Sequence, residues 1–169
     1  MADAPVQQEE TRWLNEEERE AWLFLSSIMF TLPGQLETQL VKESGLSFVE
    51  YMVLAMLSES RDQRLTMTEL ARQTNTLLPR LSRVVTRLEK QGYVERSVWE
   101  QDRRVSLCHL LPAGWEKVKE AAPGHVEDVR ARIFDRLSPA QIEALAQIGE
   151  SILGDKPSRV IAVDGVSRA

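Results

Sequence analysis

Basic and hydroxyl side chains are interleaved with aliphatic ones between residues 79 and 90, in the pattern of a helix with two unlike faces. The aliphatic residues recur at helical spacing and would be buried: Leu81, Val84, Val85 and Leu88. The polar side of the helix would carry Pro79, Arg80, Ser82, Arg83, Thr86, Arg87 and Lys90. Small and basic side chains on the outer face of a helix are what the major groove of DNA accepts.

The position of each basic residue along this helix predicts what it would contact. Arg80 and Arg83 lie near the helix N-terminus, three residues apart, and arginine can donate two hydrogen bonds to the O6 and N7 atoms of guanine. We expect these two to read base edges, and Arg87 and Lys90, further along, to contact phosphates. The charge pattern by itself also fits a helix face that contacts only solvent.

The tripeptide Asp102-Arg103-Arg104 contains two further arginines. The tripeptide ends a charged connection, residues 99–104, between two segments that alternate as strands, Tyr93–Val98 and Val105–Leu110. Arginine suits a narrow minor groove, whose potential is strongly negative. We expect Asp102 to hold one arginine in position and either Arg103 or Arg104 to reach DNA. An ordinary charged surface turn is the alternative.

The charges are unevenly distributed along an acidic chain of 169 residues with a net charge of −5. Residues 61–104 carry 10 basic and 6 acidic side chains, whereas residues 1–60 carry 3 and 11. Because electrostatic attraction acts locally, the basic middle segment could bind a polyanion although the whole chain is acidic.

Capping residues and apolar periodicity predict the helices that must position these side chains. The predicted helices are Asn15–Gly45, with a kink or break at Pro33-Gly34; Ser47 to about Ser58; a short helix opened by residues 66–69; Leu78–Gln91; Pro112–Leu137, interrupted at Pro123-Gly124; and Ser138–Gly154. Between the second and third helices, residues 58–63 are predicted to form a polar loop. The long helices at both ends of the chain have apolar faces that one lobe would not cover, so we expect them to dimerise.

Residues 66–71, residues 83–94, the tripeptide 102–104 and Gly114 stand in an order that resembles MarR-type transcription regulators. The resemblance covers roughly residues 15–153. It implies a mainly α fold with a small β wing, made of a winged helix-turn-helix at about 47–110 and dimerisation helices at about 15–44 and 112–153. It also implies a homodimeric repressor on a palindromic operator. Residues 1–14 and 155–169 are predicted to be flexible.

The chain departs from this family at two helix starts. The family usually has serine or threonine just before the recognition helix and before the following long helix, where this chain has Leu77 and Leu111. Loss of a capping hydroxyl typically costs about 1 kcal/mol, which Pro79 and Pro112 in the first helical turns would limit. One contact to the DNA backbone is therefore in doubt.

Many proteins of this family sense a small aromatic or phenolic compound in a cleft beside the dimer helices. The candidate lining residues here are Trp22, Phe48, Tyr51 and Met52. Aromatic residues at helical spacing more often belong to a core, so a core role stays open for each of them. Cys108 lies on a predicted wing strand, unlike the N-terminal cysteine of oxidant-sensing relatives, and we do not expect thiol sensing.

Other function classes find little support in the sequence. No constellation of nucleophile and base, phosphate-binding loop or metal-ligand spacing is visible, so we expect no enzyme, cofactor or metal. We expect neither a membrane span nor a signal peptide, and hence a cytoplasmic protein. The alternatives that remain are a winged-helix module that binds protein and a regulator that needs no ligand.

Overall fold

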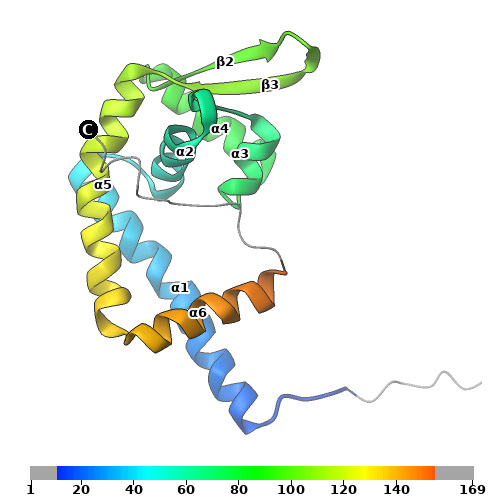
Figure 1. Cartoon of the computed structure of the whole chain (residues 1–169), viewed down its shortest axis with the longest axis vertical. Coiled ribbons are helices and arrows are strands. Elements are labelled where there is room, and N and C mark those ends of the chain that lie inside the picture. The colour runs from blue at the N-terminus through cyan, green and yellow to red at the C-terminus, as the bar shows by residue number, and fades with distance from the viewer. Residues whose placement is uncertain (1–10, 155–169) are drawn as a thin grey trace, which may run out of the picture. The chain divides into compact units, whose positions relative to one another are not determined.

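The computed structural model describes residues 11–154 (Figure 1). In chain order its elements are α1 (Glu16–Ser44), α2 (Phe48–Glu59), η1 (Arg61–Gln63), β1 (Arg64–Thr66), α3 (Met67–Gln73), α4 (Leu78–Lys90), β2 (Val94–Trp99), β3 (Asp102–Leu110), α5 (Pro112–Arg132), η2 (Phe134–Arg136) and α6 (Pro139–Leu153). The predicted fold class, mainly α with a small β wing, is confirmed. The tail 155–169 and the first ten residues of the segment 1–14 lie outside the described residues.

The chain divides into two compact units between Gly34 and Gln35. The described part of the first unit is the stretch 11–34, which includes the N-terminal part of α1, and the second unit runs from Gln35 onward. The predicted kink or break at Pro33-Gly34 does not end the helix, because α1 contains Pro33 and continues to Ser44. Proline removes one backbone donor, whereas the neighbouring residues keep their own hydrogen bonds to the preceding turn.

The predicted interruption of α5 at Pro123-Gly124 is also wrong, since the helix runs without a break to Arg132. Its buried residues lie on both sides of the proline: Gly114, Val118, Ala121, Ala122 and His125. Most helical stability in proteins comes from packing of such a face, which here outweighs a local proline cost of about 3 kcal/mol.

The sheet has the strand order β1-β3-β2, and both pairs are antiparallel. Strand β1, whose three residues precede α3, was not predicted, because a strand of that length carries no alternation that a pattern could detect. Thr66 ends β1 and caps α3, accepting a hydrogen bond from the backbone N–H of Glu69 at 3.1 Å. The sheet therefore ties the wing to the start of the helix-turn-helix.

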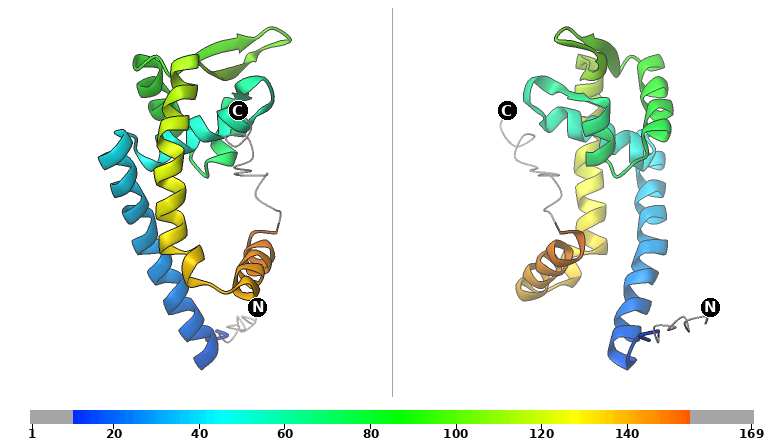
Figure 2. Two further views of the ribbon diagram at one scale, coloured as in Figure 1. Left: turned by 60° about the vertical axis from the view of Figure 1, so that its left-hand side comes forward. Right: turned by 90° about the vertical axis from the view of Figure 1, so that its right-hand side faces the viewer.

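The β2–β3 hairpin is longer than predicted. Val94 pairs with Leu110 at its base, and after an irregularity beyond Val98, Trp99 pairs with Asp102 near the tip. The expected loop 99–104 is therefore reduced, and Asp102, Arg103 and Arg104 begin strand β3. Figure 2 shows the hairpin at one end of the second unit, with a free tip.

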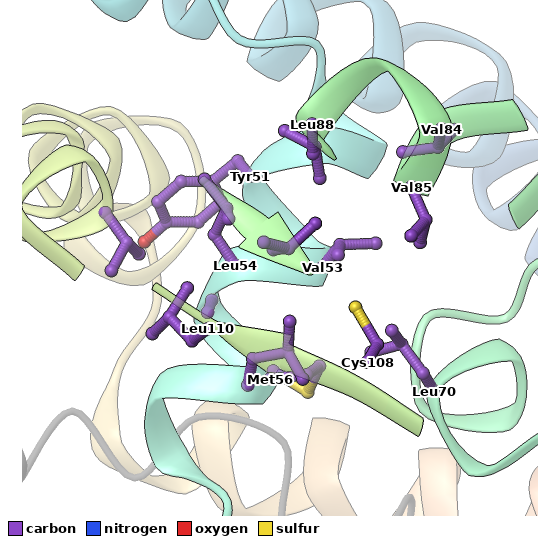
Figure 3. Close-up of a cluster of buried hydrophobic side chains, with 14 of the residues drawn as sticks. Tyr51, Val53, Leu54, Met56, Leu70, Val84, Val85, Leu88, Cys108 and Leu110 are labelled. Atoms are coloured by element: carbon purple, nitrogen blue, oxygen red, sulfur yellow. The ribbon is translucent and has the colours of Figure 1, made fainter. Parts of the chain in front are cut away.

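The core of the second unit lies between α2, α3, α4, the sheet and α5 (Figure 3). Its fully buried side chains are Leu40, Leu46, Val53, Leu54, Leu57, Leu70, Leu81, Val85, Leu88, Val94 and Cys108. Every residue of α2 from Glu50 to Leu57 except Met52 is buried, so this helix is the centre around which the others pack. Helix α4 is thus anchored on this apolar core through its buried face.

Candidate nucleic-acid interface

Helix α4 presents the two faces that its sequence predicts. Leu81, Val84, Val85 and Leu88 are buried in the core. The opposite face is exposed at Pro79, Arg80, Arg83, Arg87 and Lys90 and half-buried at Ser82 and Thr86. The helix ends at Gln91, followed by Gly92 with a φ of 73°, a left-handed conformation that glycine adopts without strain. Four cationic side chains are therefore available on one exposed side of a well-anchored helix.

The N-terminus of α4 lacks a side-chain cap, as the departure from the family pattern predicts. Leu77 is the N-cap residue, makes no capping hydrogen bond and is 80% exposed. Leu111 at the start of α5 likewise makes no capping hydrogen bond, and each helix has a proline in its first turn. An exposed leucine thus stands at the first of these two positions, where a hydroxyl could cap the helix.

Replacing Leu77 by serine should stabilise the protein by about 1 kcal/mol, because the new hydroxyl can accept a hydrogen bond from the first turn of α4. Its backbone already has the extended conformation of a cap, with φ −63° and ψ 138°. The measurement is urea denaturation, with Leu77→Ala as the matched control that removes the leucine without adding an acceptor. A stability of Leu77→Ser no greater than that of Leu77→Ala would contradict the prediction.

Arg87 is engaged by a buried carboxylate that was not predicted from the sequence. Its Nε donates to Glu50 Oε1 at 2.9 Å. Glu50 is only 7% exposed, and its other oxygen accepts from the backbone N–H of Ser47 at 2.9 Å and from the Ser47 hydroxyl at 2.7 Å. Glu50 holds the Nε atom of Arg87. Since the Arg87 side chain is still 60% exposed, its guanidinium remains accessible to a phosphate.

Arg96 on β2 makes contacts with α4 that were not predicted either. Its guanidinium pairs with Glu89 Oε2 at 2.6 Å and donates to Thr86 Oγ1 at 3.0 Å and to Ser82 Oγ at 3.4 Å. Ser82 and Thr86, both predicted to face DNA, therefore contact the wing of the same chain. Capping residues and apolar periodicity, from which the helices were predicted, do not indicate a contact between a strand residue and a helix.

The wing residues Arg103 and Arg104 are exposed on β3, as is Asp102. Asp102 Oδ1 accepts a hydrogen bond from the backbone N–H of Arg104 at 2.9 Å. The aspartate thus shapes the backbone of the wing next to the turn, and the hydrogen bond goes to the main chain of Arg104 rather than to a guanidinium.

Three of the four candidate ligand-lining residues, Phe48, Tyr51 and Met52, lie in the second unit. Tyr51 is buried in the core, and Phe48 and Met52 are partly buried and pack against it. Trp22 belongs to the first unit and is 51% exposed. Phe48 and Tyr51 instead contact His125 of α5, with ring centroids 6.0 and 4.4 Å from the imidazole.

His125 is a buried histidine whose Nδ1 has no hydrogen-bond partner among the described residues. Burial lowers the pKa of His125, and the nearby carboxylate of Asp128 partly opposes this by attracting the charged form. The imidazole is therefore held neutral in the folded protein at neutral pH.

Acidification through and below about pH 6.5 should destabilise the fold at His125. The folded pKa lies below the unfolded one, so this contribution to stability is complete above the unfolded value and is lost as the pH falls toward the folded value. Urea denaturation at about pH 7.5 and about pH 5.5 measures the loss, which should be smaller in His125→Gln. Equal losses in wild type and His125→Gln would contradict the prediction.

Cys108 is fully buried on β3, and burial raises the pKa of its thiol to about 12, with Glu89 adding to the shift and Arg96 opposing it. Because the thiolate is the reactive form, this cysteine is unreactive in the folded protein.

This arrangement of helices and wing matches proteins of known fold. A model of the MarR family matches residues 44–105. Sco3205 from Streptomyces coelicolor, a MarR family transcriptional regulator solved in complex with DNA, is 38% identical, with 90% of this chain and 96% of that chain covered and a TM-score of 0.82. The chain belongs to the MarR family. AbsC, another MarR family regulator from Streptomyces coelicolor, is 36% identical, with 86% of this chain and 100% of that chain covered and a TM-score of 0.76.

Two relatives from Bacillus subtilis align over a shorter stretch. The transcriptional repressor YetL is 29% identical over 87 residues, and the uncharacterized transcriptional regulator YdcH is 35% identical over 83 residues. These alignments cover 52% of this chain and 52% of YetL, and 48% of this chain and 56% of YdcH, so the chain spans about half the length of these relatives.

The region that matches the MarR family model contains all nine residues predicted to contact DNA, from Pro79 on α4 to Arg104 on β3. None of the described helices combines the length and apolar character needed to cross a bilayer.

Proposed function

We propose that this MarR-family protein is a sequence-specific DNA-binding repressor of transcription that acts in the cytoplasm. One observation carries the proposal: Arg80, Arg83, Arg87 and Lys90 share the exposed side of α4, while the opposite side is buried. A helix of this kind enters the major groove with its N-terminal residues at the base edges. The DNA complex of Sco3205, at 38% identity, supports the same use of the fold.

Selection of genomic fragments by the full-length protein, followed by gel-shift titration, tests the proposal. We expect enrichment of a palindrome and binding of its DNA in preference to random DNA of the same length. Absence of binding at low salt, to selected fragments and to the promoters of its own and adjacent genes, would reject it. Capture of a protein through the same exposed face would then support the alternative, a winged-helix interaction module.

Arg104→Ala should weaken binding to every DNA sequence by a similar factor, because the wing contributes mainly charge. We expect the slope of log binding constant against log salt to fall in magnitude by about 1, the effect of losing one phosphate contact. The matched control is Arg64→Ala on β1, which pairs with the far end of β3 opposite His109 and whose arginine is paired with Asp62 at 3.4 Å. An unchanged slope in Arg104→Ala would show that this arginine does not touch DNA.

We also propose that the protein is a homodimer. The apolar side chains of α6 are exposed in the single chain: Ile142, Leu145, Ile148, Ile152 and Leu153, with exposed fractions of 37–67%. On α1 of the first unit a second set is exposed: Trp22, Leu23, Phe24, Leu25, Ile28, Met29 and Phe30. Large apolar side chains exposed together on one helix mark an interface, and a two-fold contact between identical copies is the commonest solution.

Analytical ultracentrifugation tests the dimer. Ile148→Glu should shift the protein toward monomer, because it places a charge in the apolar face of α6. Gln147→Glu introduces the same carboxylate at the neighbouring position, where the native side chain hydrogen-bonds Glu143, and should leave the dimer intact. A monomeric wild-type protein, or a dimer unaffected by Ile148→Glu, would reject this proposal.

Regulation by a small aromatic acid is proposed at the contact between α2 and α5. The unpartnered Nδ1 of buried His125 lies beside the rings of Tyr51 and Phe48, a polar group in an aromatic setting within the part of the chain that the structure describes. With 4-hydroxybenzoate as the probe, we expect release of DNA by wild-type protein and reduced release from His125→Leu. Equal release from both proteins would count against this site, and lack of release by the probe would favour a ligand-independent regulator.

A further inference from the structure

Arg96 lies at the base of the wing and reaches across to the recognition helix. Its backbone N–H donates to Glu89 Oε1 at 3.0 Å, and its guanidinium pairs with Glu89 Oε2 at 2.6 Å. A single carboxylate on α4 thus holds both the main chain and the side chain of one residue on β2. This contact joins β2 to α4 in addition to the turn at 91–93 that connects them in the chain.

The same guanidinium extends along α4 to two hydroxyl groups. Arg96 Nη2 lies 3.0 Å from Thr86 Oγ1, and Nη1 lies 3.4 Å from Ser82 Oγ. Ser82, Thr86 and Glu89 are spaced by four and three residues, so they form one strip along the helix. Three helix positions over two turns are therefore tied to one strand residue.

This strip is partly shielded from water, which distinguishes it from an ordinary surface ion pair. The side chains of Arg96 and Glu89 are 33% and 26% exposed. Partial burial reduces the screening of the ion pair by salt. The planar guanidinium has enough N–H donors to bind a carboxylate and two hydroxyls at once. Lysine has one charged nitrogen and could not span all three partners.

We propose that Arg96 is a positioning residue that sets the wing relative to the recognition helix, so that the wing arginines and the arginines of α4 meet DNA in register. The proposal rests on the proposed DNA-binding function. It gives Ser82 and Thr86 a different role from the one expected from sequence: their hydroxyls hold Arg96 instead of reading bases. Arg96 acts through the geometry of Arg83 and Arg104, without touching DNA itself.

The first measurement compares binding to the selected operator with binding to random DNA. Arg96→Met, which keeps the length of the side chain but removes its hydrogen bonds, should lower the ratio of specific to non-specific binding by roughly tenfold. The salt dependence should be unchanged because no phosphate contact is lost. A fall in the salt slope by about 1 would overturn the proposal and show that Arg96 binds a phosphate directly.

Conservative variants separate positioning from general destabilisation. Arg96→Lys retains a pair with Glu89 but loses the hydroxyl contacts, so its specificity ratio should lie between those of wild type and Arg96→Met. Glu89→Gln combined with Arg96→Met should be no worse than Arg96→Met alone, since both act on one contact. Arg64→Met, an arginine loss at the other edge of the sheet, should leave the ratio unchanged. Additive losses in the double variant would contradict the proposal.

A distance measurement tests the positioning claim without DNA. Spin labels at Glu100→Cys, in the wing tip, and Thr68→Cys, at an exposed position of α3, report the wing position in the full-length protein, while buried Cys108 stays unlabelled. The distance distribution should be narrow with Arg96 and broader in Arg96→Met. Equal distributions would overturn the proposal even if the protein binds DNA, and a broadening in a protein that fails to bind DNA would reject only the proposed function.

Discussion

Replacing Gly114 with alanine should lower the free energy of unfolding by at least about 2 kcal/mol. Gly114 lies in the first turn of α5, and a Cβ there would overlap the backbone carbonyl oxygen of Tyr93 and come within 2.8 Å of Leu110 Cδ1. The carbonyl cannot easily retreat, because it accepts the backbone N–H of Leu111 at 2.9 Å. The expected strain exceeds the gain of about 1 kcal/mol that alanine brings to a helix interior.

Gly34→Ala in α1 is the matched control, since no described heavy atom beyond its chain neighbours and the adjacent backbone of α1 lies within 4 Å of a Cβ built there, and its φ is not positive. This variant should be neutral or up to about 1 kcal/mol more stable than wild type. Urea denaturation at one fixed protein concentration, which avoids confusing folding with dimer formation, measures both. Equal midpoints for Gly114→Ala and Gly34→Ala would show that the start of α5 has room to move.

Arg83→Ala should weaken binding to the selected operator by about 1 to 3 kcal/mol, or roughly 5- to 150-fold. Arg83 is exposed on the second turn of α4, next to the buried pair Val84 and Val85 that fixes the helix on the core. An arginine held there can pair with guanine, and its loss removes a base-specific contact.

Titration of operator and random DNA at the same salt concentration separates base reading from charge. Arg83→Ala should lose affinity mainly for the operator, and the Arg64→Ala control should bind both DNAs as wild type does. An equal loss on both DNAs would assign Arg83 to a phosphate, and no loss on either would remove it from the interface.

Local signals in the sequence were sufficient for much of this protein. The spacing of Leu81, Val84, Val85 and Leu88 predicted the buried face of α4, and the structure confirms it. Ser47 and Ser138 cap α2 and α6 through reciprocal hydrogen bonds with residues three positions later. These features depend on neighbours within one or two helical turns, so the pattern contains the information needed.

Contacts between distant segments could not be predicted. Glu50 and Arg87 are 37 residues apart and Ser82 and Arg96 are 14 apart, and each pair meets only after α2, α4 and β2 have packed. Glu50 looked like a capping residue and Arg96 like an ordinary strand residue. Their second roles arise from partners that no local pattern specifies.

The basic face of α4 and its buried counterpart were thus determined by the sequence alone, because helical periodicity assigns each side chain to one side. Tertiary packing decided the rest: it kept α5 helical through Pro123, drew Asp102 to Arg104 into strand β3, and brought Arg96 against Ser82 and Thr86. In each case packing and hydrogen bonding between distant segments outweigh a local preference of a few kcal/mol, which the sequence pattern cannot show.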